Sequence, residues 1–346
     1  MLIETKAAWT PQSVADIQDQ WKHTLTEQEI GEIISATDKW VLEQRPLEEL
    51  NQGNFILPTL GERLKNIASD LENGLGFYML TGLPVNDFNY EELCILYAGM
   101  GTYMGTPIAQ SVDNELVHDV YSKGESLTSE KGRGTQTCDY LPFHTDRADI
   151  VALLCLQQSK DGGQSQIVSA VSIYNEIAQT RPDLLAVLCQ NFNNIRAPWE
   201  PKVDGPTYQI PIFSIYEGQF ACRYLRNFIH YAQQVEGIPD LTAQQIEALD
   251  LVDSLCADPR FRLDIDFDKG DIQFINNFVT LHGRAAYSEY DQPHMKRFLL
   301  RLWLSSPISR PLSPLFKPLY GNVAAGSLRG GMLAQTLATQ CETETA

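Results

Sequence analysis

The sequence predicts a mainly β fold with flanking helices, a β-sandwich or barrel with helical additions. Two observations lead to this class. Short segments that are wholly apolar, or that alternate between apolar and polar residues, recur along the 346 residues, and segments of helical spacing stand between them. The chain shows no internal repeat and no clear linker, so we expect one structural domain.

The N-terminal region, residues 1–75, is expected to be helical and to pack on the core. Helical spacing covers residues 10–45 and 60–73. Helix starts are expected at Thr10, which precedes a proline, and near Thr26, which is followed by several glutamates.

Residues 76–311 are expected to form the core. The apolar run from Ile150 to Leu156 predicts a buried strand, and Arg297 to Leu304 alternates as a strand does. The clearest helix covers Thr242 to Cys256 and opens with a capping-box pattern. The other expected elements are strands over 76–83, 164–169, 261–267 and 272–276, and helices over 89–101 and 171–190, the second interrupted near residue 181.

Two stretches lack periodicity. Residues 107–141 are polar, and a loop of this length is usually functional or disordered, so we interpret it as a candidate cover for a site. Residues 312–346 are punctuated by glycine and proline and are expected to form a C-terminal extension that wraps the domain.

Composition excludes several classes of function. A net charge of -18 argues against nucleic-acid binding, and an anionic ligand would need a local cluster of arginine or lysine. No apolar run approaches the roughly 20 residues that span a membrane, and the N-terminus has no signal-peptide pattern. The seven cysteines include no CxxC pair, which disfavours a disulfide framework or structural zinc and suits a reducing, cytoplasmic location.

The residues most suggestive of chemistry are His144 and Asp146. Residues two apart on an extended chain face the same side, so this pair can offer an imidazole and a carboxylate to one point. A second histidine would complete a two-histidine, one-carboxylate face, which suits non-haem iron(II) and leaves coordination positions open. By itself this pair is weak evidence for a metal site, because both residue types are common at strand ends and helix caps.

Further candidates lie in the C-terminal half. His282 follows an apolar segment and precedes a glycine, a context that fits either a third metal ligand or a core histidine bonded to backbone. Arg297 and Arg301 share one face of their predicted strand. Buried arginines need anions, either a carboxylate ligand or the side chains of Asp and Glu.

Three stretches together resemble the taurine dioxygenase-like (TauD/TfdA) family of iron(II)- and 2-oxoglutarate-dependent oxygenases. They are FHTDRADIVALLCLQQSKDGGQSQIVSAVSIYNEI, KGDIQFINNFVTLHGRAAY and KRFLLRLWLSSP, and the resemblance runs from about residue 76 to 311 with the motif order preserved. The resemblance implies a double-stranded β-helix, that is, a jelly roll with helical flanks. It also implies that the iron ligands are His144, Asp146 and His282.

The same resemblance implies a site for the co-substrate. Arg297 matches the arginine that pairs with the far carboxylate of 2-oxoglutarate, and Ser165 falls where relatives often place a threonine that touches this carboxylate. Arg301 is ambiguous between co-substrate and substrate, because sulfonate-oxidising relatives use the matching arginine for the substrate anion. The separation of Arg297 from His282 is a few residues longer than in some members, which leaves the order within the arginine pair open.

The implied function is a dioxygenase that uses O2 to oxidise, by hydroxylation in the first place, an unactivated C–H bond of a small molecule, releasing succinate and CO2. Halogenation is disfavoured, because Asp146 fills the coordination position that a halide needs. A non-catalytic jelly roll that senses a metal or a carboxylate is the alternative, and a hydrolytic zinc enzyme would need a general base that no motif supplies. The substrate is expected to be anionic or amino-acid-like, and homo-oligomerisation stays open. The arginines that could bind it, or form salt bridges instead, are Arg147, Arg223, Arg226 and Arg301.

Overall fold

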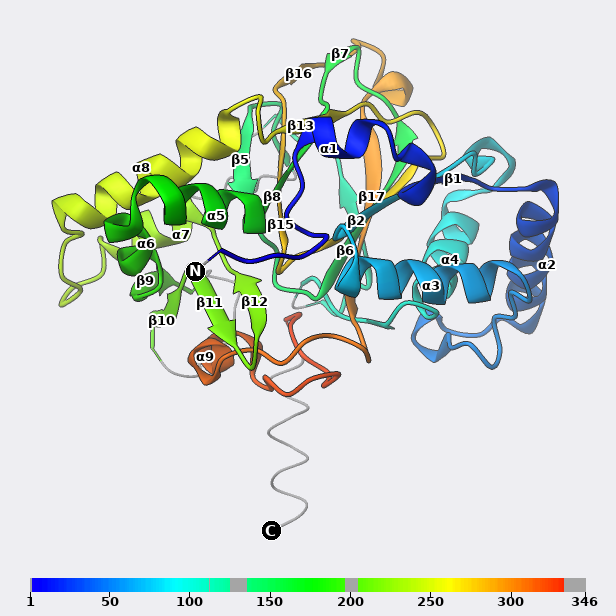
Figure 1. The fold of residues 1–346 in the computed structure, drawn as a ribbon. Coiled ribbons are helices and arrows are strands. Elements are labelled where there is room, and N and C mark those ends of the chain that lie inside the picture. Colours follow the sequence, from blue (N-terminus) through cyan, green and yellow to red (C-terminus); the bar gives the residue numbers. More distant parts are fainter. Residues whose placement is uncertain (1, 112, 125–135, 197–204, 333–346) are drawn as a thin grey trace.

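The protein is described by a computed structural model that covers residues 2–111, 113–124, 136–196 and 205–332 (Figure 1). Helices flank several β-sheets, so the structure is mixed, and the expectation of a mainly β chain understates the helices. No helix among these described residues is long and apolar enough to cross a membrane.

The largest sheet has seven strands and forms the centre of the molecule. All of its pairings are antiparallel except that of β1 with β2. Leu300 lies opposite Leu154 in the central pair, and both side chains are fully buried. The order is β1 (Lys22–Thr24), β2 (Phe77–Thr81), β14 (Ile272–Asn276), β6 (Ile150–Gln157), β17 (Phe298–Ser305) and β3 (Thr106–Pro107), with β4 (Val117–Val120) also paired to β17.

A second sheet of four antiparallel strands positions the candidate site. Its order is β13 (Leu263–Ile265), β8 (Ser165–Ser169), β15 (Thr280–Arg284) and β5 (Leu141–His144). A hydrogen bond of 2.7 Å from the hydroxyl of Ser165 to the side chain of Gln273 joins it to the larger sheet. Three hairpin-like pairs are smaller: β7 (Asp161–Gly162) with β16 (Tyr287–Ser288), β9 (Asn191–Ile195) with β10 (Thr207–Pro211), and β11 (Phe213–Tyr216) with β12 (Gln219–Cys222).

The N-terminal helices begin where the sequence predicts. Thr10 and Thr26 both form capping boxes, which satisfy the first free N–H groups of their helices. The helices are α1 (Pro11–Ala15), α2 (Glu27–Glu43), α3 (Leu60–Asn73) and α4 (Tyr90–Gly101). The helical prediction is wrong for Lys22–Thr24, because these residues form a strand that pairs with β2 in parallel.

The remaining helices lie at the opposite end of the molecule (Figure 1). They are α5 (Ala170–Thr180), α6 (Pro182–Leu188), α7 (Arg226–Ala232) and α8 (Ala243–Ala257), and a short α9 (Lys317–Tyr320) follows the last sheet strand. The capping box of α8 at Thr242 is confirmed. Of its apolar residues, Leu249 and Val252 are buried, whereas Ile246 is 43% exposed.

Two buried apolar clusters hold these layers together. The larger extends from Trp9 to Met332 and joins the N-terminal helices to the seven-stranded sheet. The smaller joins α5, α6 and α8 to the four-stranded sheet. Of the predicted loop 107–141, residues 112 and 125–135 lie outside the described residues, as do residues 333–346 of the expected C-terminal extension.

Candidate functional site

The four-stranded sheet brings the three expected metal ligands together. His144 is the last residue of β5, and His282 lies directly opposite it on β15. Their ring centroids are 4.2 Å apart. Asp146 follows just beyond β5, where its N–H donates to the side chain of Asn277 at 3.1 Å. One ligand atom from each of the three side chains lies within 4.8 Å of the others, so the group could hold a metal ion.

The two imidazoles are prepared as neutral ligands. Nδ1 of His144 lies 2.8 Å from the carbonyl of Pro142, to which it can donate, and this leaves the lone pair of Nε2 directed toward Asp146. Burial lowers the pKa of His144. Burial, followed by the charge of His144, lowers the pKa of His282 to about 3. Both rings are therefore neutral near pH 7, as a metal ligand must be.

The carboxylate of Asp146 is held in its charged form. Burial by itself would raise its pKa, but the charge of Arg301, the charges that the two histidines carry when protonated at low pH, and a hydrogen bond from Trp303 keep that pKa well below its ordinary value. Oδ2 of Asp146 accepts from Trp303 Nε1 at 3.0 Å and from Arg301 Nη1 at 3.2 Å. Sequence reasoning missed Trp303, although its position two residues after Arg301 places both on one strand face.

Arg301 is fixed on its other side by Gln110. Its Nε donates to Gln110 Oε1 at 2.7 Å, while the amide of Gln110 donates to the carbonyl oxygens of Leu116 and Arg301 itself. The guanidinium also lies 4.6 Å from the centroid of the Trp303 ring. Arg301 therefore lies beside Asp146, one of the three candidate metal ligands.

Arg297 occupies a different place, just before β17. It is buried, its guanidinium lies 5.1 Å from the centroid of Tyr287, and its Nη1 has no hydrogen-bond partner among the described residues. Arg284 lies 4.6 Å from the centroid of the same ring. Burial, and then the charge of Arg297, lowers the pKa of Arg284 to about 10. Ser165 lines the same cavity, with its hydroxyl donated to Gln273.

These side chains line one cavity of about 260 Å³ between the two sheets. Asp146 is its one acidic residue among those described, whereas six arginines line it: Arg147, Arg223, Arg226, Arg284, Arg297 and Arg301. Arg226 forms ion pairs with Asp250 at 2.6 Å and Asp253 at 2.8 Å, so its charge is already balanced. The cavity is therefore cationic within a strongly acidic protein.

A family model and two relatives match most of this chain. The model of the family described as "Taurine catabolism dioxygenase TauD, TfdA family" matches residues 43–303. An FR-33289 synthase from Streptomyces rubellomurinus is 32% identical, with 87% of this chain and 89% of the relative covered. The taurine hydroxylase-like protein SAT17 from Stachybotrys chartarum is 27% identical, with 87% and 79% covered.

Solved structures share the fold. An asparagine oxygenase in complex with Fe(II), 3-hydroxyasparagine and succinate superposes with a TM-score of 0.65 at 16% identity, covering 82% of this chain and 93% of that one. The non-haem iron oxygenase OrfP, in complex with Fe and alpha-ketoglutaric acid, gives a TM-score of 0.61 at 17% identity, covering 83% and 95%.

Proposed function

The chain belongs to the TauD/TfdA family and is an iron(II)- and 2-oxoglutarate-dependent oxygenase, and we propose that it hydroxylates a C–H bond of a small anionic substrate. The observation that carries the proposal is the grouping of two neutral imidazoles and one carboxylate at the wall of a cavity lined with arginine. The proposed iron ligands are His144, Asp146 and His282.

The donor set fits iron(II). Two neutral nitrogen ligands and one anionic oxygen form a facial set that leaves other coordination positions open. Iron bound there would supply the oxygen chemistry, with 2-oxoglutarate converted to succinate and CO2. Arg301 and Trp303 hold Oδ2 of Asp146 and leave Oδ1 for the metal, while the carbonyl of Pro142 orients His144.

We propose that Arg297 binds the far carboxylate of 2-oxoglutarate. Its free Nη1 and the nearby charge of Arg284 call for an anion, because an unpaired cation is costly to bury. Ser165 can contribute its hydroxyl after release from Gln273. We assign Arg301 to the substrate side, and its contacts with Gln110 and with the proposed iron ligand Asp146 support this assignment.

The substrate class is inferred from the cationic lining of the cavity, where six arginines and a single acidic side chain, Asp146, lie among the described residues. Such a lining attracts an acidic group such as a carboxylate. The solved complex of an asparagine oxygenase with a hydroxylated amino acid supports a small substrate that carries a carboxylate.

We also infer a jelly roll. Successive strands alternate between the two large sheets: β4 in the first, β5 in the second, β6 in the first and β8 in the second, and then β13, β14, β15 and β17 repeat the pattern in reverse. Such alternation is what two sheets wound from one folded ribbon produce. The cytoplasmic location expected from the sequence stays a prediction.

Anaerobic titration with iron(II) and 2-oxoglutarate, followed by oxygen and a panel of small acids, tests the function. We expect substrate-dependent release of succinate from the wild type and none from His282→Ala, whose iron affinity should also collapse while its circular dichroism is retained. His230→Ala removes an exposed histidine on α7 and is the matched control. Normal iron binding by His282→Ala would overturn the metal assignment.

A further inference from the structure

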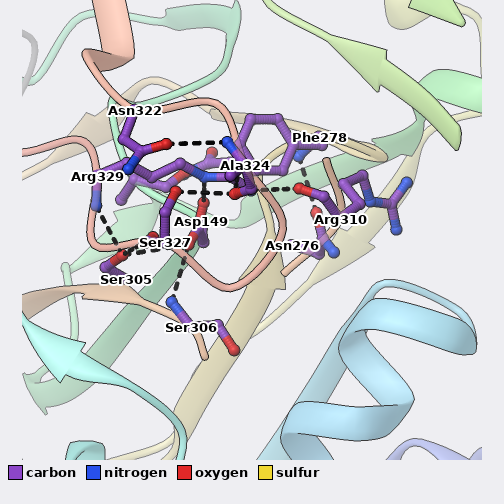
Figure 2. Close-up of polar contacts among 12 residues, drawn as sticks. Asp149, Asn276, Phe278, Ser305, Ser306, Arg310, Asn322, Ala324, Ser327 and Arg329 are labelled. Carbon is purple, nitrogen blue, oxygen red and sulfur yellow. Dashed lines mark hydrogen bonds and ion pairs between the residues drawn. The ribbon is translucent and has the colours of Figure 1, made fainter. Parts of the chain in front are cut away.

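A C-terminal strap, defined here as Ser327 to Met332, is fastened to the interior by a buried ion pair. The side chain of Arg329 is 0% exposed, and its Nε donates to Asp149 Oδ1 at 2.7 Å (Figure 2). Its Nη2 donates to the carbonyl of Arg310 at 2.8 Å, and its N–H donates to the hydroxyl of Ser305 at 3.0 Å. These contacts lock the strap against the end of β17.

The backbone of the strap then runs along the loop that follows the HxD pair. Gly331 donates its N–H to the carbonyl of Arg147 at 2.9 Å, and Met332 donates to the carbonyl of Ala109 at 2.9 Å. Gly330 has a φ of +77°, and a Cβ on it would lie 2.5 Å from the oxygen of Arg147. The approach is therefore so close that only glycine fits there.

The loop from Asp146 to Asp149 is also held by Asn277. Asn277 accepts from the N–H of Asp146 at 3.1 Å, donates its amide to Ala148 at 3.1 Å, and donates its N–H to the carbonyl of Asp149 at 3.0 Å. The loop is thus hydrogen-bonded both to Asn277 and to the strap. Met332 extends beyond it and lines the cavity.

We propose that this strap is a positioning element of the active site, which fixes Asp146 and Arg147 by clamping their loop from the C-terminal side. The inference rests on the proposed iron site for its consequence, but the clamp itself does not depend on metal. Arg329 acts through Asp149, and Gly330 and Gly331 act through the carbonyl of Arg147. Met332 and Gln110 both line the cavity.

Gly330→Ala tests the clamp, with Gly218→Ala as its control. Gly218 has a φ of +76°, nearly that of Gly330, but it lies in the exposed turn between β11 and β12, and a Cβ there meets nothing within 4 Å. Both variants therefore carry the same backbone strain. Only Gly330→Ala pushes the strap away from Arg147.

The first readout is amide hydrogen exchange without metal. In Gly330→Ala, the peptide that spans residues 144–150 should exchange about tenfold faster or more, whereas Gly218→Ala should match the wild type there. The second readout is the charge-transfer absorption of the anaerobic iron(II)–2-oxoglutarate complex. Gly330→Ala should weaken iron binding about 10- to 100-fold, as loss of the groups that support a metal ligand does.

Arg329→Lys gives a milder test in case Gly330→Ala does not fold. Its control is Arg310→Lys, which alters the buried side-chain ion pair with Glu72 but keeps the backbone carbonyl of residue 310 that Arg329 binds. Faster exchange over 144–150 in Arg329→Lys alone supports the proposal. Equal exchange in the glycine pair, or in the arginine pair, overturns it. A wild type that binds no iron would instead overturn the proposed function and leave the exchange result standing.

Discussion

The indole N–H of Trp303 offers the sharpest test of how the iron ligands are held. Trp303→Phe keeps a buried aromatic ring of similar shape but removes the donor that lies 3.0 Å from Asp146 Oδ2. The same oxygen keeps its 3.2 Å contact with Arg301, so the carboxylate loses one of two supports. The change therefore isolates one hydrogen bond at the proposed metal centre.

The expected magnitude follows from the charge of the acceptor. A hydrogen bond to a charged group contributes about 1.5–3 kcal/mol. Because Arg301 remains, the lower end applies, and about 1.4 kcal/mol corresponds to a tenfold change in an equilibrium constant. We therefore expect iron(II) to bind Trp303→Phe about tenfold more weakly, which agrees with the usual effect of removing a partner of a metal ligand.

The assay is an anaerobic iron(II) titration, with Trp21→Phe as the matched control. Trp21 is 6% exposed against 5% for Trp303, and its indole donates to the carbonyl of Val14 at the same 3.0 Å. Both variants should lose some thermal stability, but only Trp303→Phe should lose iron affinity. If the two variants bind iron equally well, Trp303 has only a packing role and the reasoning fails.

Three other outcomes are expected. Arg297→Ala should weaken 2-oxoglutarate binding by tenfold or more, since truncating one member of a buried charge pair costs about 2–5 kcal/mol; a larger loss in Arg301→Ala, measured by the same titration, would reverse the two assignments. The pKa of Glu29 is lowered to about 2, because hydrogen bonds from Thr26, His23 and Arg63 outweigh the effect of burial. The charged Glu29 therefore stabilises the fold above the ordinary pKa of 4.5, and this stabilisation is lost as the pH falls toward 2. In urea titrations, the difference in unfolding free energy between the wild type and Glu29→Gln should shrink over that pH range. A difference that grows would contradict the prediction. Wild-type product should carry no halogen in high chloride or bromide by mass spectrometry, because Asp146 fills the position that a halide needs.

Much of the strand and helix pattern could be predicted from local sequence. The apolar run of β6, the alternation of β17 and the capping boxes at Thr10, Thr26 and Thr242 depend on neighbouring residues alone. The shared orientation of His144 and Asp146 could also be predicted, because residues two apart on an extended chain face the same side. The position of His282 opposite His144 could not be predicted, because this register depends on pairing between strands that are distant in the sequence.

The features that the sequence did not predict depend on contacts between residues that are distant in the chain. Lys22–Thr24 has no strong strand pattern, and it becomes a strand because β2 offers a free edge. The strands β9 to β12 were not predicted, because each has only four or five residues and their two hairpins are stabilised by packing against residues distant in the sequence. Trp303 resembled one more core residue of an apolar strand, and only the folded structure shows that its N–H meets a carboxylate.

The ion pair that fastens the strap joins residues 180 positions apart. During translation Asp149 is synthesised long before Arg329, so the nascent chain contains that carboxylate without its partner. Burying it unpaired is costly. Assembly around the HxD loop is therefore completed only after Arg329 has been synthesised, and a product truncated before the strap would retain the sheet strands while lacking the clamp beside Asp146.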